Sequence, residues 1–418
     1  MDPQARAAAP GSATRRFLTG AGAVTAGSLL ANIAAYLLHL PASRWLGPEG
    51  YGAFAALLSA QLLVAVPSLA LQAVVAREHV RGVPHEALRS LGLRVALLVA
   101  VVAALAVMPV SVLLDTPVLA TAAALAPGPV LCLLATEQGL LQGAERFRAL
   151  GVVLALAGAG KVVPAVAVLA AGGGVGTALA AGAVGVAAAW VGAAWVGTAR
   201  VGTGRRDRAT TTRPARDPAR GTAMASPGVA AVLAAGQVQL VMMALTSVDL
   251  LLARALLSPE DAGRYALGAV AAKAAFWLPQ AVGTVLYPRM ADPAGHRGAV
   301  RSAVGVLLGI GAVVVVAAAV AAPLVPAVVG EDYRPVTGVL WAFAGLGVTL
   351  SVLQAFLLAT IATGRTAEAG VAWCGLVLTA AAVWVSPREL ESVLGATLVV
   401  VVLTTVVAGW RALRTRPA

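Results

Sequence analysis

The chain has 418 residues, of which 60% are hydrophobic and only 11% are charged, and its mean hydropathy is +0.88. Soluble domains are about half apolar and about a quarter charged, so this composition excludes an ordinary soluble protein and indicates a membrane-embedded one. The net charge of +12 does not indicate nucleic-acid binding, because the basic residues lie in short segments between apolar runs, as the positive-inside rule expects.

The N-terminal segment resembles a twin-arginine signal, because Arg15 and Arg16 precede an apolar stretch. That stretch continues through Leu40, which is longer than the roughly 7–15 residues of a signal core, and no soluble mature domain follows it. We therefore expect residues 1–16 to form a cytoplasmic tail and the apolar stretch to form the first membrane helix.

Apolar runs of membrane-spanning length recur along the whole chain, separated by charged residues, glycine and proline. They predict an all-α integral membrane protein with about twelve transmembrane helices. The expected spans are 17–40, 51–76, 89–114, 118–142, 149–170, 176–199, 229–256, 263–288, 299–322, 335–361, 367–385 and 392–410.

The distribution of arginine supports this count and sets the orientation. With the N-terminus in the cytoplasm, the inside segments hold 23 arginines. The outside segments hold five: Arg44, Arg254, Arg264, Arg334 and Arg388. One missed helix would invert every later segment, so this asymmetry favours twelve spans with both termini cytoplasmic.

A polar segment divides the spans into two sets of six. Residues 201–226 are rich in arginine and have no apolar periodicity, which indicates a flexible, basic cytoplasmic linker that also has the composition to touch anionic lipids. We expect an N-lobe over residues 17–200 and a C-lobe over residues 227–418. Because both lobes start on the same side, a pseudo-two-fold axis along the membrane normal should relate them.

A short motif occurs once in each predicted lobe, after its first span. Residues 46–55 read LGPEGYGAFA and residues 257–266 read LSPEDAGRYA, which share Pro-Glu-x-x-Gly-x-aromatic-Ala. Proline and glutamate suit the first turn of a helix, because proline lacks the amide left unpaired there and glutamate complements the positive helix end. The motif is therefore interpreted as a structural device between helices, with direct substrate contact as the alternative.

The segment R-x-L-G-P-E-x-Y-G-x-F after an Asn-bearing first helix resembles the O-antigen flippase (polysaccharide biosynthesis protein) family of the multidrug/oligosaccharidyl-lipid/polysaccharide (MOP) exporter superfamily. VDLLLARALLSPEDAGRYALG at 248–268, LLQGAERFR at 140–148 and VVGEDYRPV at 328–336 are similar to that family as well. The resemblance implies a MATE/MOP-like fold of two six-helix lobes around a central cavity that opens alternately to either side. Members usually move lipid-linked oligosaccharides across the cytoplasmic membrane.

Polar residues within the spans align at helical spacing in spans 1, 2, 7 and 8. Polar groups at membrane depth must face protein or water, so these stripes predict a hydrated cavity between the lobes. Dry interhelical hydrogen bonding is the alternative. The predicted cavity residues are Asn32, Tyr36, His39, Gln61, Gln72, Gln239, Thr246, Asp249, Lys273, Gln280 and Thr284, with Lys161 added from span 5.

The chain has only two lysines, Lys161 and Lys273, and both lie near predicted mid-membrane. A charge there costs about 3 kcal/mol on insertion scales, so each is a functional candidate. The hypothesis is that Lys161 and Lys273 attract the pyrophosphate of a lipid carrier, and that Asp249 or His39 binds a coupling proton or Na⁺. An ion pair between Asp249 and Lys273 is the structural alternative.

The sequence holds no nucleotide-binding loop, HExxH or paired CxxC, so we expect no enzyme activity, metal or cofactor. The predicted function is flipping of an undecaprenyl-pyrophosphate-type oligosaccharide across a bacterial cytoplasmic membrane for cell-surface polysaccharide biosynthesis. Its partners would be membrane lipids, the lipid-linked glycan and polysaccharide polymerases or glycosyltransferases. The alternatives are a cation-coupled multidrug antiporter, a lipid II flippase and, from another class, a membrane glycosyltransferase or polymerase.

Overall fold

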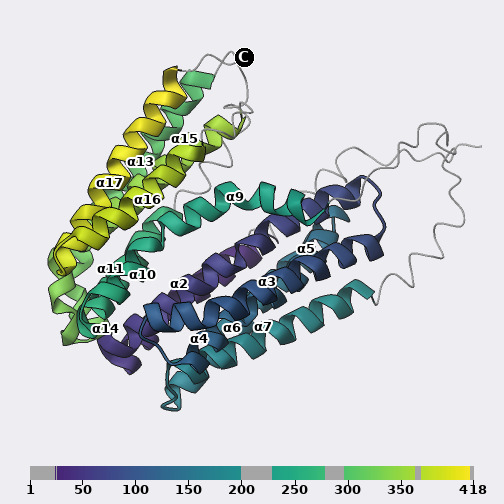
Figure 1. Cartoon of the computed structure of the whole chain (residues 1–418), viewed down its shortest axis with the longest axis horizontal. Helices are drawn as coiled ribbons and strands as arrows, with labels where there is room; N and C mark the ends of the chain where they lie inside the picture. The colour runs from purple at the N-terminus through teal and green to yellow at the C-terminus, as the bar shows by residue number, and fades with distance from the viewer. Residues whose placement is uncertain (1–23, 25, 199–227, 278–295, 363–368, 415–418) are drawn as a thin grey trace, which may run out of the picture.

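The computed structural model describes residue 24 and residues 26–198, 228–277, 296–362 and 369–414, and every regular element in them is helical (Figure 1). The predicted N-terminal tail and the predicted linker lie outside these residues. Eight of the helices are long and apolar enough to cross a membrane, and a bent helix pair makes a ninth candidate.

Each of the twelve predicted spans contains helical residues. Residues 26–37 form the first helix. The elements that follow are α2 (His39–Val80), α3 (His85–Leu113), α4 (Val118–Leu125), α5 (Pro127–Gly143), α6 (Phe147–Ala170), α7 (Val175–Thr198), α9 (Val229–Leu245), α10 (Val248–Leu256), α11 (Pro259–Trp277), α13 (His296–Ala321), η2 (Ala322–Leu324), α14 (Val325–Val329), η3 (Glu331–Gly338), α15 (Leu340–Ala362), α16 (Ala369–Val385) and α17 (Leu390–Arg414).

The expected loop between the first two spans is shorter than predicted. Residues 39–46 remain helical, and Gly47 alone breaks the chain, with φ 66° and ψ 176°. A positive φ of this kind suits glycine, which has no Cβ to clash with the backbone. The helix resumes at Pro48, in the first-turn position predicted for it, so α2 consists of two helices that meet at Gly47. Arg44, the charged residue of the expected loop, lies instead in the last helical turn before Gly47.

The expected seventh span is also broken. α9 and α10 are bent by 43° across Thr246 and Ser247. α9 packs on α2, with a Cβ on Gly236 falling 3.2 Å from Ala70 Cβ, and Val232 is fully buried in a core cluster formed mainly by residues of α2, α3 and α5. α9 also contacts α16, and α10 contacts α11, α16 and α2. Both parts of this expected span therefore contact both halves of the chain.

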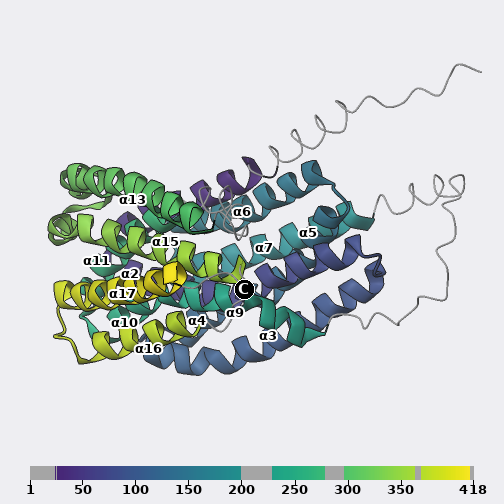
Figure 2. The same cartoon turned by 90° about the horizontal axis from the view of Figure 1, so that it is seen from above.

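The two halves meet at one end of the molecule. Helices α3, α5, α6 and α7 on one side and α13, α15 and α17 on the other lie close together near the α10–α11 turn and diverge toward the end where α17 finishes (Figure 1). Seen from above, α5 and α7 extend to the right of α13, α15 and α17 (Figure 2). We call the first end, which holds both copies of the repeated motif, the motif end. We call the other the linker end, because α7 ends there and α9 begins there.

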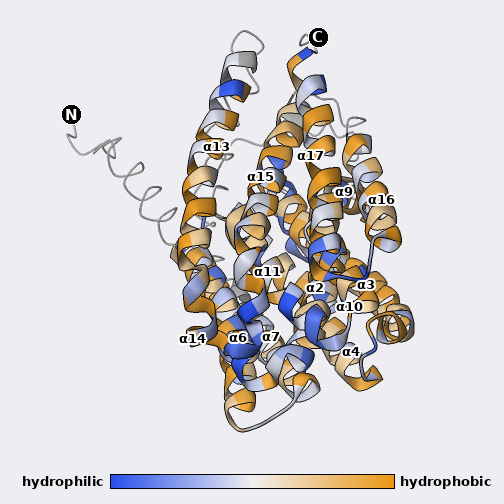
Figure 3. Cartoon of the chain, turned by 90° about the vertical axis from the view of Figure 1, so that its left-hand side faces the viewer, coloured by the Kyte–Doolittle hydropathy of each residue, from blue (hydrophilic) through white to orange (hydrophobic). Residues whose placement is uncertain are grey.

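Hydrophobic residues make up most of the outer helices, as the hydropathy colours of α13 and α17 show in Figure 3. On α3, for example, Leu105 and Val112 are 72% and 77% exposed. Exposed leucine and valine over whole helices suit a lipid surrounding rather than water. The interior has the polar groups: Arg89 of α3 forms a bidentate ion pair with the buried Glu137 of α5, with N···O distances of 2.8 and 3.0 Å.

Candidate functional site: a cavity with two lysines between the halves

A cavity of about 260 Å³ lies between the two halves of the molecule. The first helix, α2, α5 and α6 line it from one half, and α10 and α11 line it from the other. Its polar lining residues are Asn32, Tyr36, His39, Ser59, Gln61, Lys161 and Lys273, and Trp277 adds an aromatic ring. The two lysines of the chain thus open into one space from opposite halves.

Among the described residues, the lining of this cavity contains neither aspartate nor glutamate to balance the two lysines. Lys273 Nζ donates a hydrogen bond of 2.7 Å to Ser59 Oγ, which crosses from α11 to α2. Ser59 Oγ in turn donates to the Ala55 carbonyl oxygen. Among the described residues no carboxylate lies within ion-pairing distance of Lys161, so its charge is available to an anionic ligand.

Asp249 lies beside this cavity rather than in its lining. It borders a second, much smaller cavity of about 10 Å³, which has room for about one water molecule and is also lined by Thr246 and Lys273. The Tyr265 hydroxyl donates a hydrogen bond of 2.9 Å to Asp249 Oδ2. The ion pair considered between Asp249 and Lys273 does not form within 4.0 Å in the described part of the chain, because each residue has a different partner.

Two other polar side chains at the cavity differ in their hydrogen bonding: His39 has a partner, whereas Gln61 has an acceptor atom without one among the described residues. His39 Nδ1 and the Tyr51 hydroxyl share a hydrogen bond of 3.0 Å, and Tyr51 is fully buried. Gln61 is 4% exposed, and its Oε1 has no hydrogen-bond partner among the described residues. A buried acceptor without a partner is costly, so Gln61 is suited to accept a hydrogen bond from a bound ligand or water.

The structure brings Asn32, Tyr36, His39, Gln61, Lys161 and Lys273 into the main cavity, and Thr246 and Asp249 into the small one. It does not bring Gln72 or Gln239 to either. Gln72 Nε2 donates instead to Gln142 Oε1 at 3.1 Å, and Thr246 Oγ1 also donates to the Met243 carbonyl oxygen. Gln280 and Thr284 lie outside the described residues.

Two residues that matter at the site were not in the predicted set. Ser59 lies two positions before Gln61 and so falls off the polar stripe of its span, although it accepts the Lys273 hydrogen bond. Tyr265 was identified only as the aromatic residue of the motif. The signal for Tyr265 was the comparison of the two motif copies, because the first copy has Phe54, which lacks the hydroxyl that binds Asp249.

Within the described residues, no group of three or more His, Cys, Asp or Glu side chains is arranged to hold a metal ion. Cys132 is buried in α5 and Cys374 is exposed on α16, and both are free thiols. The polar groups that the described residues offer to a ligand in the cavity are lysine ammonium groups, amides, hydroxyls and a histidine ring.

No protein-family model and no curated protein sequence matches the chain, but solved structures resemble it over nearly its whole length. An inward-facing multidrug resistance MATE family transporter of the MOP superfamily superposes with a TM-score of 0.66 at 14% identity, covering 92% of this chain and 93% of that one. The Vibrio cholerae MATE transporter VcmN in its bent form gives 0.57 at 16% identity, covering 96% and 98%.

A third structure, a MOP superfamily transporter from Pyrococcus furiosus, is described as having a binding pocket of reverse polarity that suggests a different function. It gives a TM-score of 0.57 at 13% identity and covers 94% of each chain. These neighbours are transporters. The chain has the MATE-like, all-helical membrane fold of the MOP superfamily structures that it resembles.

Proposed function

We propose that the chain flips a lipid-linked, undecaprenyl-pyrophosphate-type oligosaccharide across a bacterial cytoplasmic membrane by alternating access. The observation that carries this proposal is the cavity between the halves, whose described lining residues include two lysines and no carboxylate. A pyrophosphate is a compact anion that lysine ammonium groups bind well. The acceptor Gln61 Oε1 and the rings of Tyr36 and Trp277 supply polar and apolar surface for a sugar head group.

The coupling ion in this proposal is a proton or Na⁺ that acts at Asp249 or His39. This assignment is supported by the cavities, because Asp249 lines the small cavity together with Lys273 and His39 lines the main cavity together with Lys273. The positive charge of Lys273 would therefore interact electrostatically with an ion bound at Asp249. Polysaccharide polymerases or glycosyltransferases would consume the flipped glycan. A lipid II flippase of the same superfamily would use the same cavity chemistry with a different head group.

The second candidate is a cation-coupled multidrug antiporter. It is favoured by the MATE transporters among the structural neighbours, and by Asp249, a carboxylate in the small cavity that Lys273 also lines. A cationic drug, however, requires negative charge in the binding cavity, and Lys161 and Lys273 repel it. This electrostatic difference makes the two candidates separable by ligand binding alone.

Ligand-induced thermal stabilisation of the purified protein tests the proposal. A ligand that binds only the folded state at about 100 times its Kd adds roughly 2.7 kcal/mol of stability. We expect undecaprenyl pyrophosphate to raise the Tm of the wild type. We expect a weaker effect on Lys161→Gln and a retained one on Lys161→Arg, which keeps the charge. A rise in Tm with a lipophilic organic cation and none with the pyrophosphate lipid would favour the antiporter instead.

A further inference from the structure

The two copies of the repeated motif lie against each other at the motif end. A Cβ atom built on Gly52 would fall 2.9 Å from the Gly263 nitrogen and 3.0 Å from Gly263 Cα. A Cβ atom on Gly263 would overlap the carbonyl group of Pro48. The glycine shared by both motifs is therefore what allows the first turns of the two motif helices to touch backbone to backbone.

Hydrogen bonds from the second half to the first surround this contact. The buried Arg254 donates from Nε to the Leu114 carbonyl oxygen at 2.9 Å and from Nη2 to the Asp115 carbonyl oxygen at 3.1 Å. These acceptors lie in the turn between α3 and α4, where Asp115 has a φ of 46°. An arginine that is 8% exposed and bound to two backbone carbonyls fixes the position of that turn against α10.

A third bond comes from η3. The Tyr333 hydroxyl donates to the Ser43 carbonyl oxygen at 3.2 Å, and the ring of Tyr333 packs edge-on against Tyr51. Burial raises the pKa of the Tyr333 hydroxyl above its ordinary value, so it stays protonated and able to donate. This contact joins the last turns before Gly47 to the second half of the chain.

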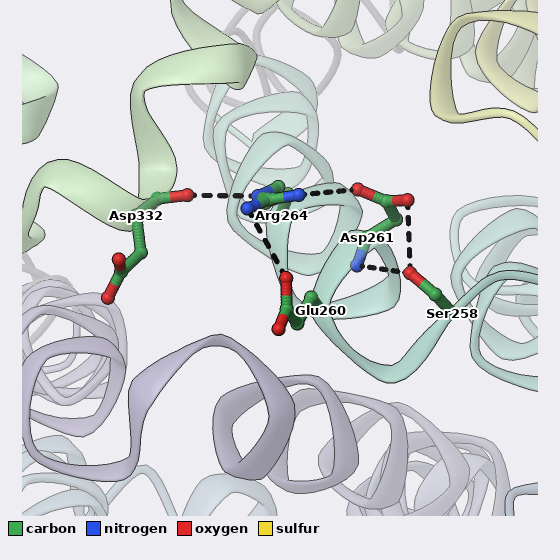
Figure 4. Close-up of polar contacts among 5 residues, drawn as sticks. All are labelled: Ser258, Glu260, Asp261, Arg264 and Asp332. Carbon is green, nitrogen blue, oxygen red and sulfur yellow. Dashed lines mark hydrogen bonds and ion pairs between the residues drawn. The ribbon is translucent and has the colours of Figure 1, made fainter.

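The second motif copy is itself braced, as Figure 4 shows. Arg264 reaches Asp261 Oδ1 at 2.8 Å, Glu260 Oε2 at 3.6 Å and, in η3, the Asp332 carbonyl oxygen at 2.9 Å. Ser258 caps the helix, because its Oγ accepts from the Asp261 amide and donates to the Asp261 carboxylate. These contacts connect the start of α11 to η3 beside the place where Gly263 meets Pro48.

We infer that the paired motifs are the seal that closes the motif end, and that Arg254 and Tyr333 latch it. Opening a path from the cavity to that end requires Gly52 and Gly263 to separate and these hydrogen bonds to break. The inference rests on the proposed function in one respect: it assumes that the cavity opens alternately to either side. It does not depend on which substrate is carried. It assigns the repeat a conformational role: the motif sets how strongly the motif end stays shut.

A cysteine placed in the cavity tests the seal. Leu62 lines the main cavity. In a chain that carries Cys132→Ala and Cys374→Ala, the labelling rate of Leu62→Cys with a membrane-impermeant thiol reagent, applied to either face of vesicles, therefore measures access to the cavity. When the reporter protein keeps Gly263, we expect the cysteine at position 62 to be labelled from the linker end. Because overlap with Pro48 exists only while the seal is shut, adding Gly263→Ala should raise labelling from the motif end roughly tenfold and lower it from the linker end.

Gly345→Ala is the matched control, since a Cβ there meets nothing within 4 Å, and it should label like its parent. Tyr333→Phe removes one latch hydroxyl and should shift labelling in the same direction as Gly263→Ala by roughly two- to tenfold. If Gly263→Ala does not fold, Tyr333→Phe decides alone. Unchanged labelling in folded protein overturns the inference. The readout requires no substrate, so a failed flipping assay beside shifted labelling would refute the proposed substrate and leave the seal standing.

Discussion

A single hydroxyl distinguishes the aromatic positions of the two motif copies, where Tyr265 corresponds to Phe54. Both rings are fully buried, and the Tyr265 hydroxyl donates to the carboxylate of Asp249, a bond that Phe54 cannot make. The repeat is therefore symmetric in its backbone role and asymmetric in its chemistry. The second copy connects the seal at the motif end to the acidic group beside the cavity.

We expect Tyr265→Phe to destabilise the protein by about 1–3 kcal/mol, because Asp249 is 4% exposed and would lose a donor that no water easily replaces. Unfolding in detergent, followed by circular dichroism, measures the change. Tyr36→Phe serves as the control, since no described residue hydrogen-bonds the Tyr36 hydroxyl, and it should stay within about 0.5 kcal/mol of the wild type. Equal stability of Tyr265→Phe and the wild type would show that the bond to Asp249 contributes nothing.

Helical periodicity correctly predicted which face of a helix a residue occupies, but it predicted less well how far along the helix that residue lies from the cavity. Asn32, Tyr36 and His39 share one face, and all three reach the cavity. Gln72 shares a face with Gln61 but lies about 16 Å further along the helix at 1.5 Å per residue, where it meets Gln142 instead. Depth depends on where the halves diverge, which is a property of tertiary packing.

At the scale of elements, small residues set how closely the helices approach. α6 and α7 cross with a Cβ on Gly185 overlapping the Gly160 backbone, and the same helix α7 carries Gly192, where a Cβ meets nothing within 4 Å. Both glycines lie in apolar surroundings in the same helix, but Gly185 faces the backbone of α6 and Gly192 faces no atom of the described residues within 4 Å of an added Cβ. They therefore separate the effect of packing from that of helix propensity.

Gly185→Ala should cost about 1–3 kcal/mol, because the added methyl forces the two backbones apart. Gly192→Ala should be neutral or stabilising by up to about 1 kcal/mol, because alanine favours the helix and nothing opposes it. Thermal unfolding of the two variants in the same detergent compares them directly. A loss at Gly192 as large as that at Gly185 would contradict the packing explanation.

Helix existence was predictable from the apolar runs, whereas two helix breaks were not placed correctly. The sequence predicted a loop of several residues between the first two spans, but Gly47 is the only residue there with a non-helical backbone conformation. The bend between α9 and α10 falls at Thr246 and Ser247, where neither glycine nor proline marks it. Both α9 and α10 contact α2 and α16, which are distant from them in the sequence, and local sequence does not report such packing.

At the scale of the whole molecule, the arginine asymmetry predicts that the motif end faces outward. A cysteine at Ser386, in the turn between α16 and α17, should react with an impermeant reagent added outside cells. A cysteine at Gly82, in the turn between α2 and α3, should react only after the membrane is opened. The reverse pattern would invert the orientation.

Flipping of a fluorescent undecaprenyl-pyrophosphate oligosaccharide in proteoliposomes, followed by quenching from outside, tests the central claim most directly. Wild type and Lys161→Arg should flip the lipid, and Lys161→Gln should flip it at least about tenfold more slowly, since a charge-assisted contact to the pyrophosphate is lost. Undiminished flipping by folded Lys161→Gln would contradict the role of the lysines. No flipping by the wild type, together with proton-driven efflux of an organic cation, would contradict the proposed function itself.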